Sequence, residues 1–354
     1  MLSLKIFVLT RRNCPMFKSM DNLIRLCKEN PPCVFSDLDY TCCLSGNSDY
    51  ERENKRLFGI KKCFLNPNAA KAFLNIRQKG GNVFFVTGRH WSSKRKDPET
   101  NLFIEDGALN DLLGGKESPF AKFNAVAGHG RQIVENGKIR LMRRSSDHEQ
   151  NKAELDFEKF ANKKMREAAR QIKKLFPDVA KYVRYECKKN LCYVNIISFP
   201  AEQNRKRFEE IFTWLRDQAL FTVNGQDCFG NKDPSAPPNP NGMFVASFDQ
   251  SGSAEIRSRS FNKGKTLLKS GFLNNALASG RPVLVCGDSL AGKGTDRDMF
   301  SAAKTLFQQN NALDKLFLIQ VLNNEPELVF DPCAPDIALS SADEFGKLML
   351  SLSE

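Results

Sequence analysis

The sequence predicts an α/β protein whose central sheet is mainly parallel. Three short apolar segments carry this prediction: CVFSD at 33–37, NVFFVTG at 82–88 and PVLVCGD at 282–288. Each segment is long enough for one strand and ends in a polar residue or glycine. Uninterrupted apolar segments of this length are typical of strands that are buried on both faces of a parallel sheet.

A helix signal lies between the first two of these segments. Asn66 can cap the helix, Pro67 suits its first turn, and the pair Gly80–Gly81 ends it. A strand, a helix and a second strand in this order form a βαβ unit, which requires a parallel sheet.

The middle of the chain has a different pattern, which predicts an α+β insert before the third strand. Its predicted elements are a helix at 151–176, a strand at 191–199, a helix at 202–219, a loop rich in proline, asparagine and glycine at 227–242, and a strand at 243–248.

A chain of 354 residues corresponds to about two domains. We expect an N-terminal extension at 1–30, a core domain made of 31–133 and 250–354, and an inserted domain at 134–249.

The chain is basic, with a net charge of +12, and therefore attracts anions. Many basic residues lie in 159–189, where a solvated helix face is the simplest interpretation. The sequence has no aromatic-interleaved basic motif of a nucleic-acid module, so a nucleic-acid partner is not expected. The apolar segments are far shorter than the ~20 residues of a membrane span, so no membrane partner is expected either.

The cysteine and histidine content favours a reducing compartment and no zinc site. The 11 cysteines are odd in number and form no CxxC pair, so we expect reduced thiols and a cytoplasmic protein. The three histidines are too few for a zinc site of the usual spacing. The first twenty residues contain no acid, which leaves an organellar address as the alternative.

Polar residues fall where the predicted strands end. Asp37 and Asp39 follow the first strand, Thr87 the second and Asp288 the third. Ligands bind at the carboxyl ends of strands in an open parallel sheet, and grouped carboxylates there can hold Mg²⁺. In DLDYT, one aspartate can attack phosphorus while the other gives a proton to the leaving oxygen and later takes one from water.

Three further motifs suit a phosphate. In VTGRH, the Thr87 hydroxyl and the Gly88 amide can donate to phosphate oxygens. In FNKGKT, Lys263 or Lys265 begins a helix, a position that the helix dipole disfavours and that hints at an anionic partner. GDSLAGKGTDRDMF adds acids at the start of another helix, where they would also be good caps.

These motifs, in this order, resemble the haloacid dehalogenase (HAD) superfamily over residues 33–348. The nearest branch is that of sugar-phosphate phosphatases, particularly trehalose-6-phosphate phosphatases and, more distantly, sucrose-phosphate phosphatases. The segments that carry this second resemblance are TGR (87–89), AGHGRQI (127–133), YECKK (185–189), EIRSRSFNKG (255–264) and TDRDMF (295–300). The resemblance implies a HAD-like Rossmannoid core with a C2B-type α+β cap.

The resemblance also implies a role for each matching residue. Asp37 would be the nucleophile that forms an aspartyl-phosphate, and Asp39 the general acid and base. Thr87, Gly88 and Lys263 would hold the phosphate. Mg²⁺ would be bound by Asp37, the backbone carbonyl of Asp39, Asp288 and Asp296. The sugar would contact His129, Glu186 and Lys188.

The sequence departs from the family pattern at two places. Tyr40 stands where the family usually has glycine, and four extra residues, AGKG, precede the last acids, so the second acid could be Asp296 or Asp298. A phosphatase acting on a small phosphorylated sugar is the main hypothesis. A sugar phosphomutase, a binding or regulatory protein without turnover, and a nucleic-acid or protein phosphatase remain as alternatives, and the oligomeric state is not predicted.

Overall fold

The computed structural model describes most of the chain, and the statements below concern those residues. They are 19–96, 103–142, 148–188, 191–196, 207, 210, 211, 213, 214, 244–248, 253–258, 261–290, 295–323 and 334–354. The chain folds as two compact units: Met1–Met142 with Asn262–Glu354, and Arg143–Phe261. Among the described residues, no helix is both long enough and apolar enough to cross a bilayer.

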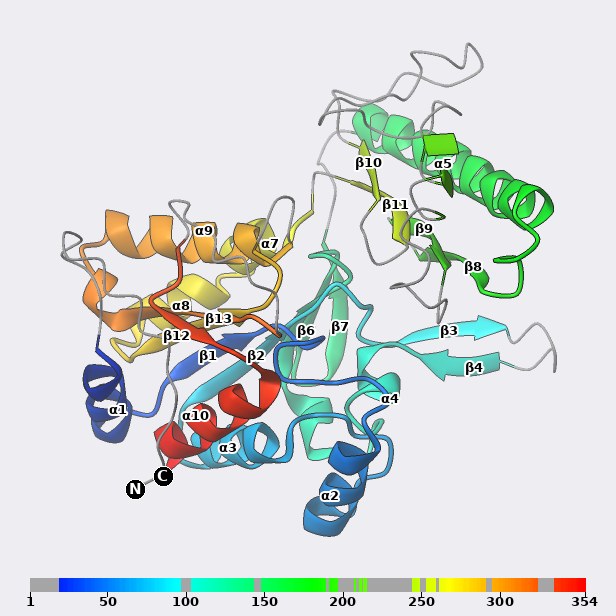
Figure 1. Ribbon diagram of the computed structural model, residues 1–354. Coiled ribbons are helices and arrows are strands. Elements are labelled where there is room, and N and C mark those ends of the chain that lie inside the picture. The colour runs from blue at the N-terminus through cyan, green and yellow to red at the C-terminus, as the bar shows by residue number, and fades with distance from the viewer. Residues whose placement is uncertain are drawn as a thin grey trace. The chain divides into compact units, whose positions relative to one another are not determined.

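The first unit is built on an eight-stranded sheet with the order β14-β13-β12-β1-β2-β5-β6-β7 (Figure 1). All pairs from β14 to β5 are parallel, and the last two pairs are antiparallel. The strands are β1 Cys33–Ser36, β2 Asn82–Val86, β5 Asn124–Ala127, β6 Gln132–Glu135, β7 Lys138–Leu141, β12 Val283–Gly287, β13 Leu316–Val321 and β14 Ile337–Leu339. The three strands predicted from apolar segments are β1, β2 and β12, which are neighbours in this sheet.

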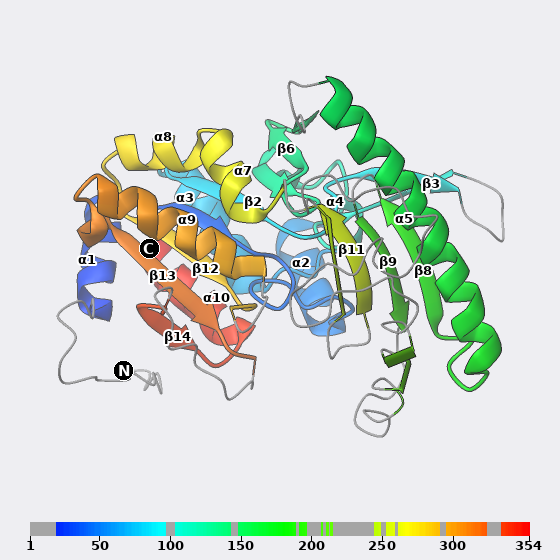
Figure 2. The ribbon, with the colours of Figure 1, turned by 90° about the horizontal axis from the view of Figure 1, so that it is seen from above.

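Helices cover both faces of this sheet, as Figures 1 and 2 show. One face carries α1 Met20–Glu29, α3 Pro67–Gln78 and α10 Ala342–Ser353, and the other carries α7 Lys263–Lys269, α8 Phe272–Ala278 and α9 Thr295–Gln309. The same unit contains α2 Ser48–Phe58, α4 Ala108–Asp111, the 3-10 helices Pro119–Lys122 and Leu313–Lys315, and a hairpin of β3 Ser93–Lys96 with β4 Phe103–Asp106. The prediction of an α/β fold with a parallel sheet is confirmed.

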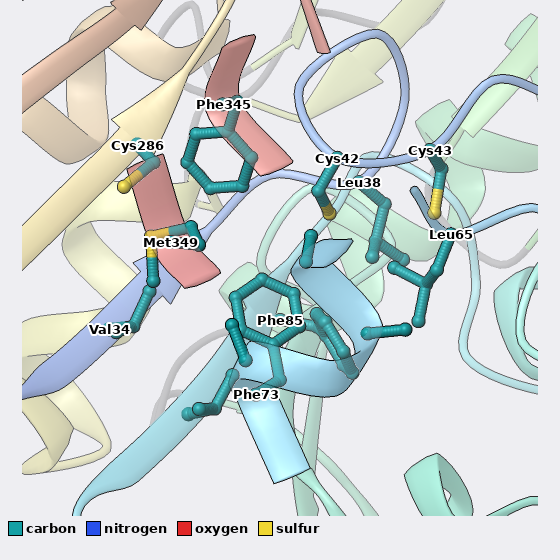
Figure 3. Close-up of a cluster of buried hydrophobic side chains, with 14 of the residues drawn as sticks. Val34, Leu38, Cys42, Cys43, Leu65, Phe73, Phe85, Cys286, Phe345 and Met349 are labelled. Carbon is teal, nitrogen blue, oxygen red and sulfur yellow. The ribbon is translucent and has the colours of Figure 1, made fainter. Parts of the chain in front are cut away.

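Each sheet face has its own apolar core. On the α3 and α10 side, Phe73 packs against Phe85 and Phe345, together with the thiols of Cys42 and Cys286 (Figure 3). On the α7 to α9 side, Phe35 stacks on Phe84 with ring centroids 4.6 Å apart. Because alternate strand residues point to opposite faces, the short apolar strands supply both cores.

Helix α3 begins and ends close to its predicted signals. The Asn66 side chain accepts hydrogen bonds from the amides of Asn68 and Ala69, and Pro67 occupies the first turn. The helix ends at Gln78, just before Gly80 adopts a positive φ of 84°. The predicted βαβ unit is therefore present.

The second unit combines one long helix with an antiparallel sheet. Helix α5 is His148–Leu175, and the sheet has the order β10-β11-β9-β8. Its strands are β8 Val183–Lys188, β9 Leu191–Ile196, β10 Phe244–Phe248 and β11 Ser253–Ser258. The predicted helix at 151–176 and the strands at 191–199 and 243–248 agree with α5, β9 and β10 within a few residues. The predicted helix at 202–219 lies largely outside the described residues, and the loop at 227–242 lies wholly outside them.

The chain passes from the first unit to the second after Met142 and back after Phe261, and both positions differ from the predicted domain bounds. Strands β6 and β7 extend the main sheet, so residues up to 142 belong to the first unit. Strand β11 pairs with β9, so the second unit continues to Phe261. Helix α1 buries Leu23 and Cys27 in the core, so residues 20–29 pack as part of the first unit rather than as an extension.

Candidate active site

Strand β1 delivers the first candidate residue to the edge of the sheet. Asp37 follows directly after β1, and its amide donates a hydrogen bond of 2.9 Å to the carbonyl of Cys286 in the neighbouring strand. The Asp37 side chain is buried, and its Oδ1 lies 2.8 Å from Lys263 Nζ. A carboxylate and an ammonium from distant parts of the chain therefore meet at the carboxyl end of the sheet.

Lys263 reaches this position because α7 packs closely on α9. Asn262 caps α7 through the Lys265 amide, and Lys263 is the first helical residue. A Cβ atom at Gly264 would lie only 2.0 Å from the Asp298 carbonyl oxygen, so glycine permits this close approach. Lys263 is buried whereas Lys265 is exposed, which distinguishes the two lysines that the sequence left open.

Asp296 lies on α9 and joins the same group. Its Oδ1 lies 2.5 Å from Lys263 Nζ, and its Oδ2 accepts hydrogen bonds from the amides of Asp288 and Ser289 at 3.1 and 3.0 Å. Both oxygens are therefore engaged, and the side chain fixes the start of the loop after β12. Asp298, two residues later, is exposed.

The carboxylate oxygens of Asp37, Asp288 and Asp296 lie within 4.8 Å of one another. Three carboxylates against the single Lys263 ammonium leave two negative charges uncompensated when all four groups are ionised. An unbalanced buried charge of this size is costly without a cation. The residues present therefore fit a divalent ion with oxygen ligands, such as Mg²⁺.

The titration of these groups reflects the same imbalance. Burial, and then the charge of Asp296, raise the pKa of Asp37 to about 7. Burial and the charges of Asp296 and Asp37 likewise raise the pKa of Asp288 well above its ordinary value. For Lys263, burial lowers the pKa, but the two facing carboxylates outweigh it and the net shift is upward. The lysine therefore stays charged, and a bound cation would favour the ionised forms of Asp37 and Asp288.

Asp39 faces a different partner. Arg89 binds its carboxylate in a bidentate manner, with Nε 2.8 Å from Oδ2 and Nη2 2.8 Å from Oδ1. Both side chains are partly exposed, at 26% for Asp39 and 36% for Arg89. Two parallel charge-assisted bonds fix both the position and the plane of a carboxylate. The two aspartates of DLDYT therefore have different surroundings: Asp37 lies among carboxylates that can hold a metal ion, and Asp39 is bound by Arg89.

Thr87 and Gly88 follow β2 on the other side of β1. Thr87 is buried, its amide donates to the Val126 carbonyl at 2.8 Å, and its Oγ1 accepts from the Arg89 amide at 3.0 Å. Gly88 lies against His129, because a Cβ atom there would be 2.7 Å from the imidazole Cε1. Thr87 and Gly88 are therefore held beside Arg89, and His129 is brought to the same turn.

The other two predicted sugar contacts lie in the second unit. Glu186 and Lys188 are on β8, where they pair in register with Tyr193 and Leu191 of β9. Their role as substrate contacts stays a prediction.

The turn after Asp39 differs from the surrounding backbone. Tyr40 has a positive φ of 57°, and its side chain is 61% exposed. Its amide donates to the Cys43 carbonyl at 2.9 Å, and its carbonyl accepts from Asn323 Nδ2 at 2.6 Å. A tyrosine in the left-handed region is strained, so these bonds hold a backbone shape that glycine would adopt freely.

Three residues near the site had no assigned role in the sequence analysis. Arg89 binds Asp39, the Thr41 hydroxyl donates to Asp288 Oδ1 at 3.3 Å, and the Cys42 thiol donates to the Asp37 carbonyl at 3.2 Å. The sequence does carry a signal for Arg89, because it follows Thr87 and Gly88 at the carboxyl end of β2, the strand next to β1. Thr41 and Cys42 carry no signal of this kind, because their partners depend on the turn at Tyr40.

Comparison with known proteins gives matches by structure only. No protein-family model matches the chain, and no curated protein matches its sequence. The C-terminal domain of trehalose-6-phosphate phosphatase from C. albicans matches with 13% identity, a TM-score of 0.52, and coverage of 95% of this chain and 97% of that chain. The C-terminal domain of the Candida albicans trehalose synthase regulatory protein matches with 9% identity, a TM-score of 0.52, and coverage of 95% and 98%.

At these identities the matches establish the fold. The chain has a HAD-like α/β architecture, with a central sheet that is mainly parallel and helices on both of its faces.

Proposed function

We propose that the protein is a Mg²⁺-dependent phosphomonoester hydrolase that transfers the phosphoryl group of a phosphorylated sugar to Asp37. The observation that supports this most strongly is the group of three buried residues, Asp37, Asp296 and Lys263, and the half-buried Asp288 at the carboxyl end of the sheet. Its two uncompensated negative charges suit a divalent cation, and its lysine suits a phosphate.

In this proposal the carboxylates of Asp37 and Asp288 and the Asp39 carbonyl hold the metal ion. When bound, Mg²⁺ would supply charge stabilisation for the phosphoryl oxygens. Asp296 has both oxygens occupied by hydrogen-bond donors, so we assign it to positioning Asp288 and Lys263. This refines the expectation that Asp296 binds the metal directly.

In the proposed reaction, residues of this chain form and break the bonds to phosphorus and move the protons. The Asp37 carboxylate forms a bond to phosphorus as the bond to the sugar oxygen breaks. Asp39 must be protonated for this step, so it leaves its bidentate pair with Arg89 as the substrate binds and donates its proton to that oxygen. Asp39, now ionised, takes a proton from water as the water attacks phosphorus and frees Asp37. Lys263 offsets negative charge on the transferred group, and Thr87 and Gly88 donate hydrogen bonds to it.

The choice of a sugar substrate rests on the similarity of the fold to a known structure. One structure of similar fold is a trehalose-6-phosphate phosphatase. We propose that the second unit is a C2B-type cap that excludes water from the reaction, with His129, Glu186 and Lys188 as contacts of the sugar. A reducing, cytoplasm-like compartment is proposed from the free thiols of six buried cysteines of the first unit, with an organelle as the alternative.

One alternative has an observation in its favour. A catalytically silent regulatory protein would agree with the strained Tyr40 next to Asp39, and a domain of a regulatory protein has a similar fold. A phosphomutase has the same Asp chemistry and differs in needing a bisphosphate primer. The hydrolase is preferred over the silent protein because Asp37, Asp288, Asp296 and Lys263 lie together, as its chemistry requires.

The test is phosphate release from a panel of phosphosugars and from p-nitrophenyl phosphate, with and without Mg²⁺. We expect Mg²⁺-dependent release that Asp37→Asn abolishes and Asp39→Asn reduces strongly. Asp298→Asn is the matched control, because Asp298 lies on the same helix as Asp296 but is exposed. A folded protein that binds Mg²⁺ but releases no phosphate from any monoester would favour the regulatory alternative.

A further inference from the structure

Helix α5 carries a continuous line of basic side chains on its exposed face. We name this line the basic stripe. It consists of Lys152, Lys159, Lys163, Arg166, Arg170, Lys173 and Lys174, all of them exposed. The sequence alone shows that this segment is basic, whereas the helix shows that its charges share one face.

The stripe lies opposite the buried face of the helix. Successive stripe residues are separated mostly by three, four or seven positions, which keeps them in one line at 3.6 residues per turn. Phe157, Ala161, Met165, Ala168 and Ile172 follow the same spacing half a turn away and are buried. Figure 1 shows α5 with the strands β8 and β9 on one side of it. The apolar face therefore holds the unit together, and the stripe is available for binding.

Few acidic groups balance the stripe. Asp156 lies within it and is paired with Lys159 at 3.1 Å, and Glu149 and Glu167 border it. Within the described part of the chain, Lys152, Lys163, Arg170, Lys173 and Lys174 have no ion-pair partner. The line from Lys152 to Lys174 is about 33 Å long at 1.5 Å per residue, so it presents an extended, unbalanced positive charge.

We infer that the basic stripe docks the protein on an anionic lipid surface. A flat surface touches a straight helix along one line, so the cations that are not engaged within the unit can approach a bilayer together, and mobile anionic lipids can gather beneath them. Two are engaged: Arg166 lies over the Tyr185 ring, 5.6 Å from its centroid, and Lys159 pairs with Asp156. Leu155, on the edge of the stripe, is 49% exposed and can enter the headgroup region. Binding of this kind needs surface charge and no membrane span, so it replaces the expectation of no membrane partner, which was drawn from the shortness of the apolar segments.

Nucleic acid fits this geometry less well. A duplex turns once in about 34 Å, so a straight line of this length parallel to its axis crosses each strand about once. Only a few of the cations would then meet phosphates. A helix in the major groove would reach phosphates from its flanks, whereas the basic residues here share one line.

The experiment uses the full-length protein and sedimentation with vesicles of phosphatidylcholine containing about one third phosphatidylserine, compared with phosphatidylcholine alone. We expect binding to the anionic vesicles only, and its loss at about 0.5 M salt. Each basic residue is worth roughly fivefold in partitioning, so Lys163→Gln, Arg170→Gln and Lys174→Gln together should weaken binding on the order of a hundredfold.

The matched control removes the same charge from the first unit. Lys28, Lys55 and Lys71 are exposed, and the triple change of these residues to Gln should weaken binding by less than about tenfold. Circular dichroism melting checks that both variants are folded. The inference is overturned if the wild-type protein does not bind anionic vesicles, if both variants lose binding equally, or if a polynucleotide at equal phosphate concentration displaces the vesicles.

Discussion

Lys263 and Asp296 form a buried ion pair at the centre of the candidate site, with Nζ 2.5 Å from Oδ1. The pair joins the first residue of α7 to the first turn of α9. Through its other oxygen, Asp296 also binds the amides of Asp288 and Ser289, so one side chain connects the lysine to the loop after β12. The positions of Lys263 and Asp288 are therefore coupled.

We expect Lys263→Met to lower the free energy of unfolding by about 3–5 kcal/mol, because it leaves buried carboxylates without their partner. Urea unfolding at pH 8 without Mg²⁺ measures the change. Lys265→Met, two residues along the same helix at an exposed position, is the matched control and should leave stability nearly unchanged. Equal effects of the two substitutions would show that the buried pair contributes no more than a surface lysine.

We expect Mg²⁺ to stabilise the protein more strongly at pH 8 than at pH 5. The pKa of Asp37 rises from 3.8 to about 7 on folding, so the folded protein binds a proton that the unfolded chain lacks between these values. Without metal, this group's stabilising contribution is present below about pH 4 and is lost as the pH rises toward 7. Mg²⁺ must displace the proton, so its binding strengthens with pH.

The measurement is the change in melting temperature on adding Mg²⁺ across this pH range. Asp37→Asn should remove the part of the pH dependence below pH 7 that this carboxyl group gives to the metal-free protein. It should also remove most of the stabilisation by Mg²⁺. Chelation of the metal should reverse the stabilisation in the wild type. A Mg²⁺ effect of the same size at pH 5 and pH 8 would contradict the proton linkage.

We expect Arg89→Ala to impair turnover of a sugar phosphate more than turnover of p-nitrophenyl phosphate. Arg89 fixes the proposed acid Asp39, and a sugar leaving group needs the proton that an aryl leaving group does not. General acid catalysis is worth roughly 10²–10⁴-fold, so we expect a loss of about 10²-fold in kcat on the sugar phosphate. Arg89→Lys should restore only part of it, because lysine cannot bind a carboxylate through a planar fork.

Arg56→Ala is the control for this prediction. Arg56 also binds a carboxylate, that of Glu53, through Nε and Nη2, but on the solvent-exposed surface of α2. Its removal should leave both activities unchanged. Equal losses on the sugar and aryl substrates after Arg89→Ala would mean that Arg89 acts on phosphate binding instead of on Asp39.

The sequence predicts the sheet and the strand ends well because they depend on local pattern. Cys33–Ser36 and Val283–Gly287 are apolar and short, and Asp37 and Asp288 follow them directly, so their convergence follows from parallel pairing alone. The choice of Lys263 over Lys265 depends on the contact of Gly264 with the Asp298 backbone, which joins two helices far apart in sequence.

Contacts that depend on backbone shape could not be predicted in the same way. The bond between Thr41 and Asp288 requires the turn at Tyr40, and the hydrogen bonds of Asp296 require Asp288 and Ser289, which directly follow β12, to lie against the start of α9. The first unit extends to β7, Lys138–Leu141, because this strand pairs with β6. The side chains of β7 are all exposed, so its sequence has no alternation of buried and exposed residues from which a strand could be predicted. These features follow from tertiary pairing and not from local propensity.

The strain at Tyr40 gives a prediction that is opposite in sign to the usual effect of glycine. At φ 57° a residue with a Cβ atom is disfavoured by about 1 kcal/mol relative to glycine, so Tyr40→Gly should be more stable than Tyr40→Ala by roughly that amount. Both variants lack the ring, so the comparison isolates the backbone. At Lys71, an exposed residue within α3, glycine should instead be less stable than alanine by about 1 kcal/mol. Urea unfolding of the four variants measures both differences. If glycine were the less stable residue at both positions, the turn after Asp39 would not be strained. The exposed tyrosine would then need no functional explanation for its presence beside the proposed acid.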